Sequence, residues 1–87
     1  MNVTNRLALF ETAQEIFNTL IAIRSEQIYI ERSSANPNEE KIAYWQAEQD
    51  FFSAQEDALQ FDDLEEIERV IRTYGPEVKA TFTNRSE

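Results

Sequence analysis

The residues with the clearest chemical potential are acidic, and they are densest at 62–68, where the sequence is DDLEEIE. Carboxylate oxygens are the ligands that Mg²⁺ and Ca²⁺ prefer. Glu65 and Glu68 stand three residues apart, which places both side chains on one face of a helix. A magnesium site would need a second acidic pair facing the first, and a calcium loop would need a Gly at its sharp turn. The sequence offers neither, so we interpret this segment as the acidic start of a helix and expect no metal.

Side chains that most enzymes use are missing. The sequence has no His and no Cys, which excludes Ser–His and Cys–His nucleophile pairs and zinc sites built from those residues. The di-iron Glu-x-x-His motif is excluded for the same reason. A single Gly in 87 residues rules out glycine-rich phosphate-binding loops. We expect a protein that is not an enzyme and uses no cofactor.

Charge restricts the partners further. Lys and Arg total 8 against 17 Asp and Glu, and the span 42–68 holds nine carboxylates with no basic residue. A surface of one sign attracts basic proteins and repels nucleic acid and anionic lipid. We therefore expect a basic protein partner and no direct contact with nucleic acid or membrane. The predicted partner-binding acidic face comprises Asp50, Glu56, Asp57, Asp62, Asp63, Glu65 and Glu66.

Aromatic residues are concentrated in the same half of the sequence. Proteins that stack nucleobases surround such rings with Lys and Arg, and here the neighbours are acids. At helical spacing most of these rings are interpreted as core. Tyr44 and Trp45 are predicted to form an aromatic rim of the partner contact, where such anchors are enriched.

Periodicity predicts three helices, at about 4–32, 37–61 and 63–74. In the first, apolar residues recur every seven positions along one face, at Leu9, Ile16, Ile23 and Ile30. Arg24 falls within that face and is expected to pair with an acid such as Glu56 or Asp57. Three apolar columns of the second helix are predicted to be buried: Tyr44/Phe51/Ala58, Trp45/Phe52/Leu59 and Ala47/Ala54/Phe61.

Capping residues give the predicted helix ends. Asn36 is expected to cap the second helix, with Pro37 as its first residue. Asp62 or Asp63 is expected to start the third helix, and the dipeptide at 75–76, Gly-Pro, to end it. The residues after it leave room for one short further turn, followed by a polar tail at 83–87.

A short loop between two long helices forces them to lie antiparallel. The predicted fold is therefore all-α, a helical hairpin with a shorter third helix packed against it as a three-helix bundle, in a single domain of 1–87. The third helix is too short to cover both long ones, so some apolar surface should stay open. A homodimer or a hetero-complex is expected to use it.

Location is predicted from what the sequence lacks. There is no basic cluster followed by an apolar run, and no apolar stretch near the roughly 20 residues that cross a bilayer. We expect a soluble, cytoplasmic protein.

Two classes of function remain open. The first is an inhibitor, antitoxin or immunity-type protein that blocks a basic, nucleic-acid-handling partner by charge complementarity, as a nucleic-acid mimic does. The second is a small chaperone or homodimeric adaptor that acts through an exposed apolar helix stripe. Added salt should weaken the first kind of complex and leave the second intact.

Overall fold

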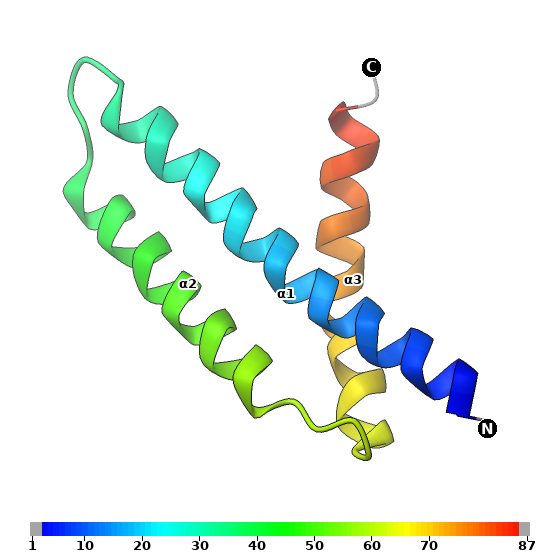
Figure 1. The fold of residues 1–87 in the computed structure, drawn as a ribbon. Coiled ribbons are helices and arrows are strands. Elements are labelled where there is room, and N and C mark those ends of the chain that lie inside the picture. The colour runs from blue at the N-terminus through cyan, green and yellow to red at the C-terminus, as the bar shows by residue number, and fades with distance from the viewer. Residues whose placement is uncertain (1–2, 86–87) are drawn as a thin grey trace. The chain divides into compact units, whose positions relative to one another are not determined.

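The computed structural model describes residues 3–85, with side chains described for 4–83. This part of the chain forms three helices, α1 (Val3–Arg32), α2 (Glu39–Ala58) and α3 (Leu64–Arg85), and contains no strand (Figure 1). The predicted all-α, three-helix fold is confirmed. The chain divides into two compact units that share α1: Phe17–Asp57, here called the hairpin unit, and Met1–Ile16 with Ala58–Glu87, here called the terminal unit. Folding as one domain stays a prediction.

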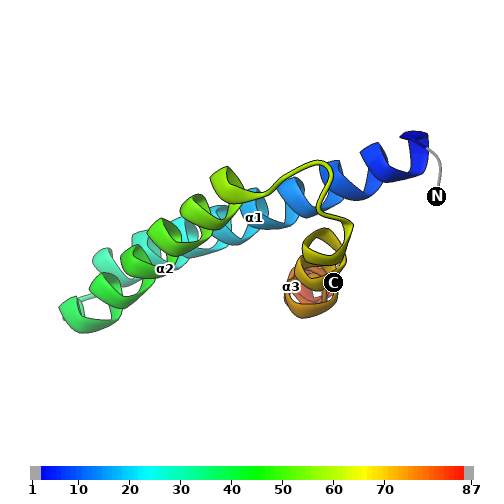
Figure 2. The same ribbon diagram turned by 90° about the horizontal axis from the view of Figure 1, so that it is seen from below.

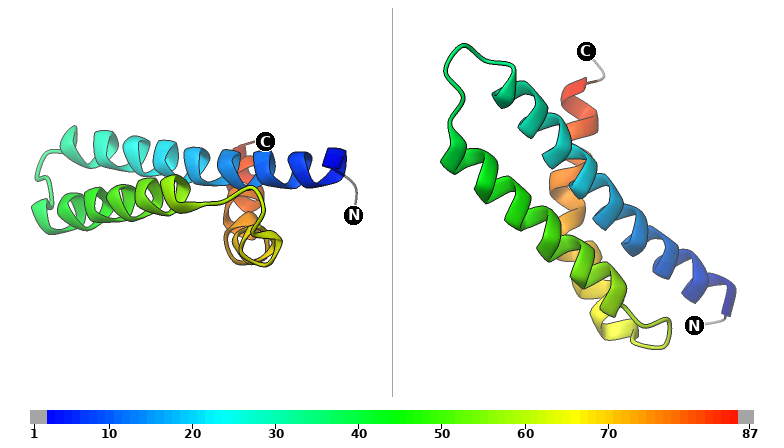
Figure 3. Two further views of the ribbon diagram at one scale, coloured as in Figure 1. Left: turned by 60° about the horizontal axis from the view of Figure 1, so that its bottom comes forward. Right: turned by 60° about the vertical axis from the view of Figure 1, so that its left-hand side comes forward.

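In the hairpin unit, α2 runs antiparallel to the second half of α1, as predicted (Figure 3). Two serine side chains cap the C-terminal end of α1. The hydroxyl of Ser33 donates to the carbonyl of Tyr29 at 2.9 Å, and that of Ser34 donates to the carbonyl of Glu31 at 2.7 Å. The same two carbonyls also accept the amides of Ser33 and Ser34, both at 3.1 Å, so each serine closes the end of the helix with two bonds.

The second helix begins two residues later than predicted. The side-chain oxygen of Asn38 accepts hydrogen bonds from the amides of Glu40 and Lys41 at 3.0 and 3.1 Å, so Asn38 is the N-cap. The predicted cap at Asn36 and helical Pro37 are wrong. Both Asn residues suit a cap, and it is Asn38 whose side chain reaches the first-turn amides.

The second helix also ends earlier than predicted. The amide of Asp63 donates to the carbonyl of Gln60 at 3.1 Å, which forms a turn where helix was expected. Phe61 therefore lies off the helix, and its ring meets that of Phe10 edge to face at 5.7 Å, within the terminal unit.

The third helix starts as predicted and ends much later. The carboxylate of Asp63 accepts from the amide of Glu66 at 3.1 Å and caps the first turn. With 22 residues α3 is longer than α2 with 20, so the predicted shorter helix ending at 74 is wrong. Of the predicted polar tail, 83–85 are helical, and 86–87 lie outside the described residues.

Gly75 and Pro76 lie inside α3 instead of ending it. Gly75 has no positive φ, so it is not a left-handed C-cap. A helical residue before proline suffers a clash that involves its Cβ, and Gly75 has no Cβ to clash. Its open side faces α1 in the terminal unit, where a Cβ would lie 3.9 Å from Cδ1 of Ile16. Within the terminal unit, Figure 2 shows α3 nearly end-on while residues 3–16 of α1 are seen from the side, so these two segments cross steeply.

Each of the two units contains its own buried apolar side chains. The hairpin unit contains Phe17, Leu20, Ile28, Ile42 and Phe52, and the terminal unit contains Ala13, Ile16, Leu59, Ile67 and Val70. The face predicted for α1 is correct except at its end, where Ile30 is 61% exposed. Some apolar surface does remain open, as predicted, and Tyr44 and Phe51 of α2 are part of it.

Candidate protein-binding surface

One face of α2 is fixed against α1 by contacts within the hairpin unit. The ring of Phe52 lies 6.3 Å from that of Phe17. Gln49 donates through Nε2 to the carbonyl of Ile21 at 3.0 Å and to the hydroxyl of Ser25 at 2.7 Å. The inner face of α2 therefore mixes apolar and hydrogen-bonded contacts, and the opposite face is left to solvent.

Arg24 is buried in this hairpin with Glu48 as its partner. Its Nε donates to Glu48 Oε1 at 3.0 Å, and its guanidinium carbon lies 5.8 Å from the centre of the Phe52 ring. The predicted pairing with Glu56 or Asp57 is wrong. The antiparallel register sets Arg24 beside Glu48, about two turns before those acids.

The outward face of α2 carries an apolar stripe. Tyr44 and Phe51 are 64% and 50% exposed. Ala47, which lies between them in the sequence, and Ala54, which follows Phe51, are exposed as well. We call these four residues the outer stripe. At 100° per residue the two alanines lie about 140–160° around the helix from Phe52, and Tyr44 and Phe51 lie about 80–100° from it, so the stripe runs from the flank of α2 to its outer face. Two of the three columns predicted to be core are thus exposed, because α2 faces a single helix within the hairpin unit and one partner buries one stripe.

Of the predicted site residues in the hairpin unit, three are turned outward. Asp50 and Asp57 are exposed, seven residues apart along one edge of the outer stripe, as is Tyr44 within it. Glu56 and Trp45 are half-buried on the inner side of α2. Of the two residues predicted as an aromatic rim, Tyr44 is exposed and Trp45 is not, and the exposure of Phe51 was missed.

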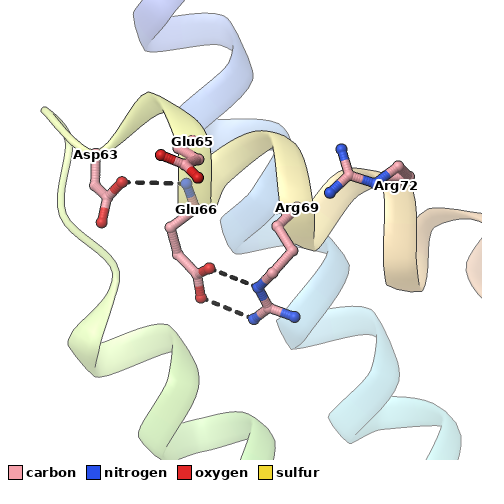
Figure 4. A pocket seen from close by; sticks show the side chains of 5 residues that line it. All are labelled: Asp63, Glu65, Glu66, Arg69 and Arg72. Atoms are coloured by element: carbon pink, nitrogen blue, oxygen red, sulfur yellow. Dashed lines mark hydrogen bonds and ion pairs between the residues drawn. The ribbon is translucent and has the colours of Figure 1, made fainter.

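Three of the four predicted acids of the terminal unit, all except Asp62, line a shallow hollow of about 250 Å³ at the start of α3. Figure 4 shows Asp63, Glu65 and Glu66 together with Arg69 and Arg72. The acidic cluster thus includes two cations, Arg69 and Arg72, which follow the cation-free span 42–68 in the sequence. Arg69 stands three residues after Glu66, and this i, i+3 spacing was the signal that could have revealed the contact between them.

Glu66 and Arg69 form a two-pronged ion pair along α3. Arg69 donates through Nε and Nη2 to the two carboxylate oxygens of Glu66, the Nη2 bond being 2.8 Å (Figure 4). The hydrogen bonds from Arg69 lower the pKa of Glu66, and the same bonds raise the pKa of Arg69. Glu66 is therefore held ionised, but its charge is already neutralised inside the chain.

Asp62 and Asp63 are exposed and differ in their local contacts. The side chain of Asp63 caps α3, and the carbonyl of Asp62 accepts a long hydrogen bond of 3.4 Å from Nη2 of Arg6. The carboxylate of Asp62 and that of Glu65 point to solvent and contribute directly to the surface charge.

Within 3–85, no three acidic side chains converge in a way that would hold a metal ion. No helix of that range combines the length and the apolar character needed to cross a bilayer.

Comparison with known proteins gives no further information about function. The sequence matches no protein-family model and no curated protein, and the fold matches no solved structure.

Proposed function

We propose that this protein is a non-enzymatic binding module that blocks a basic, nucleic-acid-handling protein by charge complementarity, as inhibitors, antitoxins and immunity proteins do. The observation that carries the proposal is the exposure of acids within 42–68, a span without a single cation. Six of its nine carboxylates are exposed: Asp50, Asp57, Asp62, Asp63, Glu65 and Glu68. A cytoplasmic location belongs to the same proposal.

Ion pairs within the chain leave most of this charge in place. Glu48 is paired with Arg24 and Glu66 with Arg69, so two of the nine carboxylates are neutralised. The electrostatic potential of the exposed acids extends into solution over about one Debye length, near 10 Å at 0.1 M salt. A basic partner would be steered to this surface, with fast and salt-sensitive association.

A second candidate function is favoured by the outer stripe. The exposed rings of Tyr44 and Phe51 are what a small chaperone or homodimeric adaptor would use as its contact. Such a complex would be held by apolar burial, so salt would leave it intact or strengthen it.

The experiment is a pull-down with the full chain at about 50 and about 300 mM salt, with bound proteins identified by mass spectrometry. We expect strongly basic proteins to be retained at low salt and released at high salt. Recovery of no basic protein at low salt would contradict the proposal. Retention that is unchanged at high salt would favour the adaptor.

Charge variants with a matched control localise the effect. Asp50→Asn/Asp57→Asn and Asp62→Asn/Glu65→Gln each remove two exposed negative charges. Glu11→Gln/Glu15→Gln removes two exposed charges from α1 and serves as the control. We expect retention to fall about tenfold or more in at least one of the first two variants, and to change little in the control. Equal losses in all three would show that only net charge matters.

A further inference from the structure

The second helix has two apolar stripes, and the hairpin uses one of them. Ile42 and Phe52 on the inner face are 2% and 4% exposed, whereas Tyr44 and Phe51 on the outer stripe are at least half exposed. The outer stripe follows the alternating three- and four-residue spacing of a helix–helix seam. The ring of Phe51 meets that of its chain neighbour Phe52 edge to face, with centroids 5.7 Å apart, and about half of Phe51 stays exposed. This second seam is therefore a surface on which another helix can pack.

The side chains of the outer stripe alternate in size. Tyr44 and Phe51 are one heptad, or about 10 Å, apart along α2. Ala47 lies between them and Ala54 follows, so small residues separate the two rings. Large side chains of an opposing helix can enter above the alanines while the two rings fill the spaces on that helix, which is knobs-into-holes packing.

Charge at the edge of the outer stripe selects the occupant. Asp50 and Asp57 are exposed along one edge, and the whole chain carries a net charge of −9. A second copy of the chain would bring the same acids and the same net charge to the contact, which costs binding energy. A helix with Lys or Arg beside its apolar stripe would instead pair with these acids.

We infer that the outer stripe docks an amphipathic helix of the partner, with its apolar side on Tyr44 and Phe51 and its basic flank on Asp50 and Asp57. The mode is helix-in-groove recognition, in which aromatic anchors supply affinity and flanking charge supplies orientation. This inference rests on the proposed function, and it names the element of the basic partner that the acidic surface would block.

The probe is a synthetic peptide of about 18 residues with a Leu stripe at helical spacing and Lys on the flanking positions. Isothermal titration calorimetry with the full chain should detect binding. A peptide of the same composition in scrambled order keeps the charge and loses the stripe. We expect it to bind about tenfold more weakly or worse. Absence of binding by the patterned peptide, or equal binding by both, would overturn the inference.

Two double variants make the test specific to this face. Tyr44→Ser/Phe51→Ser removes both rings from the outer stripe, and Tyr29→Ser/Ile30→Ser removes two exposed apolar side chains, 73% and 61% exposed, from α1 of the same hairpin. We expect the first variant to weaken peptide binding about 30-fold or more and the second to change it less than threefold. Circular dichroism confirms that each variant keeps its helix content.

The outcomes separate this inference from the proposed function. If basic proteins are still retained by Tyr44→Ser/Phe51→Ser with wild-type salt sensitivity, the docking inference is wrong and the proposed function stands. If no basic protein is retained even by the wild type, the proposed function is wrong. If sedimentation shows a dimer that Tyr44→Ser/Phe51→Ser converts to monomer, the occupant is a second copy and the inference is overturned.

Discussion

Arg24 shows how one residue makes the hairpin specific. A buried guanidinium is costly unless a carboxylate and other groups replace its water, and here Glu48 and the face of Phe52 do so. The side chains of Arg24 and Glu48 are 10% and 26% exposed. Solvent therefore screens their attraction only in part, and water cannot easily take the place of either side chain in the pair. The pair can exist in one register of the two helices, and it therefore disfavours a slipped hairpin.

We expect Arg24→Met to lower the free energy of unfolding by about 1–3 kcal/mol, because it leaves Glu48 partly buried without its partner. Glu48→Met should also destabilise. The double variant Arg24→Met/Glu48→Met should lose less than the sum of the single losses, by about 1 kcal/mol or more. Urea denaturation of the four proteins measures this coupling. Additive losses would mean that the two side chains stabilise the hairpin independently.

Among the three helices, α3 is the one whose C-terminal end local sequence rules predict least well. Pro76 fixes a φ that a helix accepts, but it lacks the amide that would bond the carbonyl of Arg72. Gly75 before it has no Cβ to clash with the proline ring, so the helix can continue through the pair. The result is a continuous helix with one missing hydrogen bond near its middle.

We expect Pro76→Ala to raise the free energy of unfolding by about 1–3 kcal/mol, because it restores a backbone donor at an exposed position where no packing is lost. Ala80→Gly, at another exposed position of α3, is the control and should lower stability by about 1 kcal/mol. Thermal and urea unfolding followed by circular dichroism measure both changes. A loss of stability in Pro76→Ala would show that a bend at this point is needed for packing.

For the whole molecule, the dominant property is unbalanced charge. With 17 acids against 8 bases, the chain repels itself at neutral pH, and this repulsion opposes the compact state. The ion pairs Arg24–Glu48 and Arg69–Glu66 work in the other direction, and Arg24–Glu48 is partly buried, so salt screens it less than it screens the exposed acids. The same excess of acid that would recruit a basic partner therefore weakens the fold.

We expect the midpoint of thermal unfolding to rise when salt is raised from about 20 to about 300 mM, because screening removes more repulsion than attraction. A change of about 1 kcal/mol corresponds to about 4–8 °C for a chain of this size. Differential scanning calorimetry at fixed pH measures it. The variant Asp50→Asn/Asp57→Asn should respond less to salt. A midpoint that falls with salt would mean that the internal ion pairs dominate.

Local sequence signals predicted much of this fold. The apolar periodicity of α1 and the capping carboxylate of Asp63 were sufficient because both depend on neighbours within a few residues. The start of α2 was misplaced because Asn36 and Asn38 satisfy the same local rule. The end of α3 was misplaced because the Gly-Pro rule assumes that a helix gains nothing by continuing, whereas Val78 beyond the proline is still half-buried in the structure.

The candidate site was predicted less completely. Acidic residues were identified from composition, but which ones are neutralised depends on register and on side-chain geometry, as Glu48 and Glu66 show. The exposure of Tyr44 and Phe51 could not be deduced from periodicity, since a helix with several apolar columns does not specify which column its neighbour covers. Packing on α1 within the hairpin unit decides that choice.

Trp45 gives the hairpin an optical reporter. It is the single indole of the sequence, it is half-buried on α2, and it follows Tyr44 directly in the chain. Its fluorescence emission should move to longer wavelength when the hairpin opens and water reaches the ring. A ligand seated beside it should change its intensity without any attached dye, so folding and recognition can be followed through the same native chromophore.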